Sequence, residues 1–164
     1  MGTRGTILRT TNAGASWVGQ VSGTTQGLYG VFFTDVSNGT AVGLAGTILR
    51  TINGGLSWSP QQSGTTNDLF RISFANANTA MAVGDNGTIL RTTNAGTTWL
   101  VLSTGTTRPL FAVALTDPET ATAVGYLGTI LRTTNAGAGW IQQAGGTTGS
   151  LFGVSFSDAQ NGTC

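Results

Sequence analysis

The segment Val-Gly-Asp-Asn-Gly-Thr-Ile-Leu-Arg-Thr-Thr-Asn-Ala-Gly-Thr-Thr-Trp, residues 83–99, recurs along the chain at a fixed period. Residues 124–140 repeat it 41 positions later, and shorter matches occur in the first half of the chain. The four tryptophans have the same spacing, and four periods of 41 residues make up all 164 positions. A period of about 40–45 residues with strand-like content is typical of the four-stranded blades of β-propellers.

Four strands are expected in the repeat at residues 67–107. Residues 69–74 alternate large apolar with small or polar side chains, which is the period of two of a β-strand. The further expected strands are residues 79–84, 88–92 and 98–102. Asn86-Gly87 favours the positive φ angles of a type I′ hairpin turn. No segment has a helical period, so the sequence predicts an all-β chain.

The predicted fold is a β-propeller of four 41-residue, four-stranded antiparallel blades, forming a single domain over residues 1–164. The expected repeats are approximately residues 1–25 plus 149–164, 26–66, 67–107 and 108–148. In the aligned repeats, Cys164 corresponds to Ala41 and Met1 to Val42, so both termini fall within the second strand. We expect pairing of the terminal segments to close the ring, either within one chain or between chains as a larger ring, because closure removes unpaired sheet edges.

Composition excludes several classes of function. Charged residues make up 8% of the chain, its net charge is +1, and all seven cations are arginine. Such a chain has no basic tract for nucleic acid or an anionic membrane surface, so neither is expected as a partner. It has no apolar run long enough for a membrane span, and no signal peptide at its start. Cys164 is the only cysteine and histidine is absent, so we predict no metal site and no cofactor.

A turn before each tryptophan is the second repeated motif. It reads Thr-x-Asn-x-Gly-x-x-Trp and resembles the Asp-box, or BNR repeat, of sialidase-type propellers. The residues concerned are Thr10, Asn12, Gly14, Trp17, Thr51, Asn53, Gly55, Trp58, Thr92, Asn94, Gly96, Trp99, Thr133, Asn135, Gly137 and Trp140. The hydroxyl and amide groups can bond nearby backbone as an Asx turn, and glycine permits a positive φ. We therefore expect these boxes to be structural.

The longer string Val-Gly-x-x-Gly-Thr-Ile-Leu-Arg-Thr-Thr-Asn-Ala-Gly-x-x-Trp is similar to repeats of the photosystem II stability and assembly factor family. The resemblance implies a seven-bladed, non-enzymatic propeller that binds a photosystem subunit during assembly. It also implies the thylakoid lumen or another extracytoplasmic compartment. This chain differs in having four repeats and no signal peptide.

Arginine supplies the candidate binding residues. One arginine follows Ile-Leu in each repeat, and propeller symmetry would place the four in a ring. They are Arg9, Arg50, Arg91 and Arg132. The ring could offer guanidinium groups to a partner, or each stem could pack between blades and pair with a turn carbonyl or an Asp. Arg71 is a fifth candidate, because the other repeats carry Gly or Ala at its position in the first strand. It could face a ligand in the central channel, or be a solvated arginine at the channel mouth.

Catalytic chemistry is not expected. A Ser-His-Asp or Cys-His arrangement needs the histidine that the chain lacks. Asp35, Asp117 and Asp158 share one repeat position after the first strand, and Asn76 takes that place in the other repeat. A residue type that recurs at a turn is expected to cap that turn. No two carboxylates stand out as a pair facing one substrate, which a glycosidase would need.

The sequence thus predicts a non-enzymatic propeller scaffold that binds a protein partner. A first alternative is an Asp-box propeller of the carbohydrate-binding or sialidase-like kind. A second is a repeat fragment or an engineered unit without a dedicated partner, since the repeat count is integral and both ends fall within a strand. A homodimer that forms an eight-bladed ring is a further expectation, because docking between chains would be equivalent to docking between blades.

Overall fold

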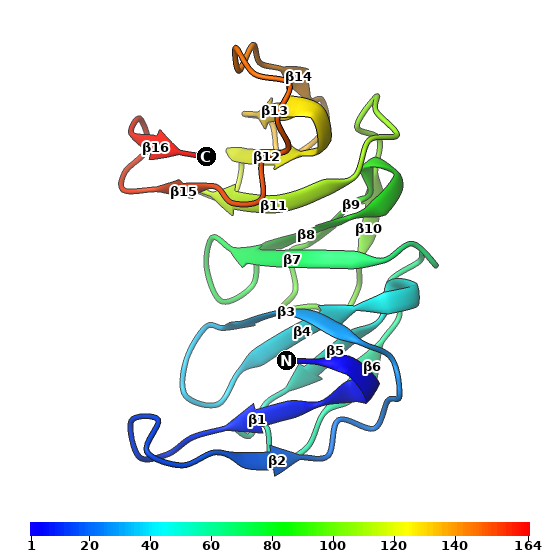
Figure 1. Ribbon diagram of the computed structural model, residues 1–164, viewed down its shortest axis with the longest axis vertical. Helices are drawn as coiled ribbons and strands as arrows, with labels where there is room; N and C mark the ends of the chain where they lie inside the picture. The colour runs from blue at the N-terminus through cyan, green and yellow to red at the C-terminus, as the bar shows by residue number, and fades with distance from the viewer.

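The computed structural model describes residues 1–164 as sixteen strands in five antiparallel sheets that follow one another along the molecule (Figure 1). Three sheets have four strands each, in chain order, and we call each of them a complete blade. Their strands are β3 (Leu28–Phe33), β4 (Gly39–Gly43), β5 (Ile48–Thr51) and β6 (Ser59–Gln61); β7 (Leu69–Phe74), β8 (Ala80–Gly84), β9 (Ile89–Thr92) and β10 (Leu100–Leu102); and β11 (Leu110–Leu115), β12 (Ala121–Gly125), β13 (Ile130–Thr133) and β14 (Ile141–Gln142).

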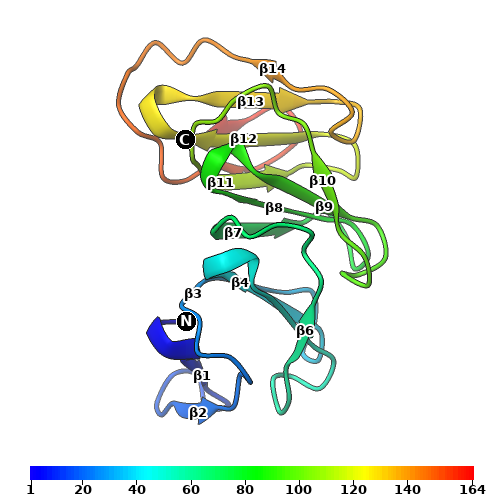
Figure 2. The same cartoon turned by 90° about the vertical axis from the view of Figure 1, so that its right-hand side faces the viewer.

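The two remaining sheets have two strands each, and we call them half-blades. They are β1 (Ile7–Arg9) with β2 (Val18–Gln20), and β15 (Ser155–Phe156) with β16 (Gly162–Thr163). The first corresponds to strands three and four of a complete blade, the second to strands one and two. The expected pairing of these halves within one chain is absent, since three complete blades lie between them (Figures 1 and 2). The chain therefore forms an open series of blades, and of the two expected modes of closure the one within a single chain is not formed.

The hairpin between strands two and three is a one-turn element in each repeat. The four elements are η1 (Thr3–Gly5), η2 (Leu44–Gly46), η3 (Asp85–Gly87) and η4 (Tyr126–Gly128). In η3, Asn86 and Gly87 have φ angles of 51° and 65°, which are the two positive values of the predicted type I′ turn. A Cβ on Gly87 would come within 2.1 Å of the Thr106 carbonyl oxygen. Glycine is needed there for both reasons.

The core lies between blades and depends on the second strand. All five residues of β8 are buried, and β4 and β12 show the same pattern. Ala80 and Ala82 join a cluster shared with the preceding blade, whereas Met81 and Val83 join one shared with the following blade. Because strand residues alternate between the two faces, this strand is covered on both sides by neighbours. A single blade could not bury these side chains alone.

The first strands β3, β7 and β11 lie side by side at the inner edge of the complete blades (Figure 1). Each contains a β-bulge where its pairing with the second strand shifts register. The bulged residues are Tyr29, Phe70 and Phe111. A bulge leaves one residue out of the ladder and redirects its side chain. No helix in the structure has the length and apolarity needed to span a bilayer.

Candidate functional site

The Thr-x-Asn-x-Gly turns form the same hydrogen-bond network in the first three repeats. In the second copy, the Thr51 hydroxyl donates to Asn53 Oδ1 (2.9 Å) and accepts from the Gly55 N–H (2.8 Å). Asn53 Oδ1 also accepts from the Ser57 N–H (3.0 Å), and Asn53 Nδ2 donates to Ser57 Oγ (2.9 Å). Because the amide donates as well as accepts, asparagine serves this turn where an ionised aspartate would only accept.

The last copy departs from this network in one bond. Gly139 replaces the hydroxyl residue, so its N–H still donates to Asn135 Oδ1 (3.0 Å) but offers no oxygen to the Asn135 amide. The tryptophan that ends each box turns toward the preceding blade. Trp58 is 7% exposed and its indole N–H donates to Gln20 Oε1 (3.4 Å), whereas Trp17, with no blade before it, is 58% exposed.

The ring arginines reach toward the next blade along the chain. The Arg91 Nη2 donates to the Pro118 carbonyl oxygen (3.3 Å), which lies in the turn between β11 and β12. The Arg9 guanidinium lies against Gly54, where an added Cβ would come within 3.0 Å of its Nη2. In this geometry the arginine stems span the joint between two blades.

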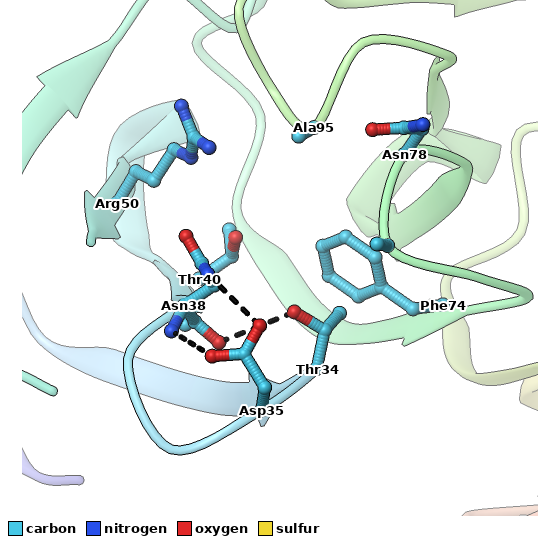
Figure 3. A pocket seen from close by; sticks show the side chains of 10 residues that line it. Thr34, Asp35, Asn38, Thr40, Arg50, Phe74, Asn78 and Ala95 are labelled. Atoms are coloured by element: carbon cyan, nitrogen blue, oxygen red, sulfur yellow. Dashed lines mark hydrogen bonds between the residues drawn. The ribbon is translucent and has the colours of Figure 1, made fainter. Parts of the chain in front are cut away.

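Arg50 borders a cavity of about 200 Å³ between two complete blades. Figure 3 shows its side chain above the cavity, with Asp35 and Asn38 on the side of its own blade and Phe74 on the other. The Asn38 amide donates to Asp35 Oδ2 (2.8 Å), so the carboxylate is already bound within its turn. The cavity is therefore lined by one cation, Arg50, and by one carboxylate, Asp35, which is already hydrogen-bonded within its own turn. It presents no pair of free carboxylates.

Arg132 and Arg71 have exposed side chains. Arg132 occupies the ring position at the joint with the β15–β16 half-blade, which lacks the outer strands of a complete blade. The hydrogen bond from the Glu119 N–H is the main cause that lowers the pKa of Asp117, and the charge of Arg132 adds a smaller effect in the same direction. Arg71 lies on β7, directly after the bulged Phe70. The five candidate arginines are thus not one cluster: Arg9, Arg50 and Arg91 are half-buried at joints between blades, whereas Arg71 and Arg132 are exposed.

The turn after each first strand is held by an acceptor side chain. Asp35 Oδ1 accepts from the N–H groups of residues 37 and 38 at 2.7 and 2.9 Å. Asn76, Asp117 and Asp158 accept in the same way from the second and third residues after them. These bonds favour the ionised form and hold the pKa of all three carboxyl groups below the ordinary range, with the Asn38 amide as the largest cause for Asp35.

The remaining candidate feature is a row of aromatic rings that sequence reasoning missed. Its members are Tyr29, Phe70, Phe111 and Phe152, one from each successive repeat. Successive ring centroids are 5.9, 5.8 and 5.0 Å apart. The signal was present as an aromatic residue every 41 positions. Within a single strand these residues look like ordinary large apolar side chains.

Comparison with known proteins places the chain among propellers. Residues 23–162 match the family described as photosynthesis system II assembly factor YCF48. A structure of YCF48 bound to D1 peptide has 23% sequence identity and a TM-score of 0.72, over 83% of this chain and 45% of that one. YCF48 from Cyanidioschyzon merolae has 25% identity and a TM-score of 0.68, over 80% of this chain and 47% of that one. The chain therefore spans about half the length of these proteins.

A GH74 xyloglucanase from Xanthomonas campestris also aligns, with 15% identity, a TM-score of 0.68, and coverage of 88% of this chain and 28% of that one. At this identity the likeness shows the fold alone. No curated protein matches the sequence.

The lowered pKa values of Asp35, Asp117 and Asp158 lead to a prediction about how the stability of the fold changes in acid. Because their folded pKa values are lowered, their contribution is complete above the unfolded value of about 3.9 and is lost as the pH falls through the lower folded values. Asn76 shows that asparagine can make the two backbone bonds without titrating. A variant with Asp35→Asn, Asp117→Asn and Asp158→Asn should therefore unfold in urea at a midpoint that changes less between pH 4 and pH 2 than that of the wild type. Parallel midpoint curves for the two proteins would contradict this prediction.

Proposed function

We propose that this chain, which belongs to the photosynthesis system II assembly factor YCF48 family, is a non-enzymatic β-propeller scaffold that binds a protein partner. The observation that carries the proposal is the family match over residues 23–162, which spans all three complete blades. A YCF48 has been observed bound to D1 peptide. For this chain we propose a partner of the same class, namely a segment of another protein.

The chemistry of the carboxyl groups supports a role without catalysis. A general acid for sugar hydrolysis needs a raised pKa and an open position at the bond that it cleaves. Asp35, Asp117 and Asp158 have the opposite shift, because their oxygens accept hydrogen bonds within their own turns. The carbohydrate-binding or sialidase-like alternative therefore ranks second. Its support is the likeness in fold to GH74 enzymes.

The arginines divide between the two roles that the sequence left open. We assign Arg9, Arg50 and Arg91 to the joints between blades, because Arg91 bonds to the next blade and Arg9 lies against it. We assign Arg71 and Arg132 to partner binding, because both guanidinium groups are exposed. The box residues, from Thr10 to Trp140, remain structural in this proposal. Their Thr and Asn side chains bond within the turn, and the tryptophans after the first pack against the preceding blade.

The function can be tested with two assays on the 164-residue chain. Fluorescence anisotropy should show saturable binding of a labelled D1 peptide, and neither xyloglucan nor a fluorogenic sialoside should be hydrolysed. Exposed arginines that pair with an anionic group contribute through charge-assisted hydrogen bonds, so Arg71→Gln should weaken binding by about tenfold. Arg4→Gln, which changes another exposed arginine, is the charge control. Hydrolysis above the buffer rate, or no peptide binding, would contradict the proposal.

We further propose that a second copy of the chain covers the two half-blades and makes an eight-bladed ring. Leu8 of the first half-blade is 50% exposed, whereas Leu49 at the same repeat position is 2% exposed, so an apolar face there has no cover. Thr40 pairs with Arg50 in the complete blade, and the equivalent residues are Thr163 of one copy and Arg9 of the other. This register would join β16 to β1 and complete a four-stranded blade.

Light scattering tests the ring directly. One chain has a mass of 16.7 kDa, and the ring predicts a species of twice that mass that dissociates on dilution. Leu8→Asp would place a charge in the new joint and should shift the equilibrium to single chains, because burying an unpaired charge is costly. A single-chain mass at all concentrations would contradict the ring while leaving the scaffold function intact.

A further inference from the structure

The aromatic row occupies an unusual place in the fold. Tyr29, Phe70 and Phe111 lie at the bulges of β3, β7 and β11, and Phe152 continues the row just before β15. None of the four rings belongs to the three buried clusters that hold the blades together. Tyr29 is 47% exposed and Phe152 is 68% exposed, and the two rings between them are half-buried. The row is therefore a continuous apolar strip along the inner edge of the series.

The arrangement of the rings limits what can bind there. Phe111 and Phe152 stack, with ring centroids 5.0 Å apart and an interplanar angle of 21°. The pairs Tyr29–Phe70 and Phe70–Phe111 are tilted, at 5.9 and 5.8 Å with interplanar angles of 54° and 43°. A sugar that stacks on an aromatic residue needs a free ring face. The inner rings, Phe70 and Phe111, are half-buried and have a neighbouring ring on either side, so neither offers a wholly free face. This geometry favours aliphatic or aromatic side chains over a glycan.

An extended segment of protein fits the spacing of the row. Alternate residues of an extended strand lie about 6.6 Å apart on one face, which is close to the separation of neighbouring rings. Such a segment could set one side chain against each ring while its backbone crosses β3, β7 and β11. These three strands lie next to one another, so the row gives one uninterrupted track.

Arg71 adds a charge to this track. It follows Phe70 on β7, at a position that is Gly30 in one neighbouring blade and Ala112 in the other. Its side chain is exposed, and Asp68, the acidic residue nearest to it in the sequence, accepts a hydrogen bond from the Ala45 N–H (2.9 Å). Arg71 thus adds an exposed cation directly after a ring of the row, on the same strand, and a carboxylate is the natural partner of a guanidinium.

We propose that Tyr29, Phe70, Phe111, Phe152 and Arg71 form a docking track for an extended protein segment whose alternating apolar side chains lie next to a carboxylate. This inference rests on the proposed function, because it specifies the kind of protein segment that the scaffold binds. It places the partner surface at the inner edge of the series, away from Arg9, Arg50 and Arg91 at the joints between blades.

The test uses one designed probe in two forms. The labelled peptide Leu-Ser-Leu-Ser-Leu-Ser is prepared with a free C-terminal carboxylate and as its C-terminal amide, and anisotropy measures both affinities for the 164-residue chain. The carboxylate form should bind at least about tenfold more tightly to the wild type. Arg71→Gln should abolish that difference, because the variant has no guanidinium for the carboxylate. Phe111→Leu should weaken both forms, because it removes a ring from the centre of the track.

Phe32→Leu is the matched control. Phe32 lies on β3 and stacks against Phe74 of the next blade at 5.3 Å. The Phe32→Leu substitution therefore removes a comparable aromatic contact between blades, away from the row. Urea unfolding should show comparable losses of stability for Phe32→Leu and Phe111→Leu, with only the second losing affinity.

Equal affinities of the wild type for acid and amide, or unchanged binding by Phe111→Leu, would overturn the track. If the labelled D1 peptide binds while neither form of the probe does, the track fails and the scaffold function stands. If no peptide binds, both fail together.

Discussion

The fold depends on burying both faces of the second strand of every blade between its neighbours. In β8, two alanines face one neighbouring blade, and Met81 and Val83 face the other, so the strand has no solvent side. Small side chains on one face let the blades approach closely, and larger ones on the opposite face fill the next joint. Close-packed interiors tolerate little change in volume. This constraint explains why the repeats are so similar and why stability depends on their stacking.

The same constraint determines where function can reside. Residues shared by every repeat are largely occupied in holding the blades: Gly87 admits the Thr106 carbonyl, the box amides bond within their turn, and Arg91 bonds to the next blade. A partner must therefore use what stacking leaves uncovered. That surface comprises the inner edge with its aromatic row, and positions such as Arg71 where one repeat differs from the others.

Much of the blade could be predicted from the sequence, because it follows from local pattern. The strand at residues 69–74 and the type I′ turn at Asn86-Gly87 are as expected, since period-two alternation and turn chemistry are properties of short segments. The mode of closure could not be predicted, because repeat alignment shows that the two half-blades are complementary but not whether they meet within one chain. The aromatic row was missed because residues 29, 70 and 111 look like ordinary strand residues in the sequence. Only the β-bulges, which the sequence pattern does not reveal, take these residues out of the ladder and redirect their side chains.

The central claim, that packing between blades governs the second strand, can be tested by comparing Ala82→Val with Ala77→Val in urea unfolding. Position 82 is alanine in all three complete blades, whereas position 77 is an exposed turn residue whose counterpart in the preceding blade is Val36. Intrinsic strand propensity favours valine, so only packing predicts that Ala82→Val will lose stability. We expect a loss of about 1–3 kcal/mol at position 82 and little change at position 77. An equal or higher free energy of unfolding for Ala82→Val would contradict the account.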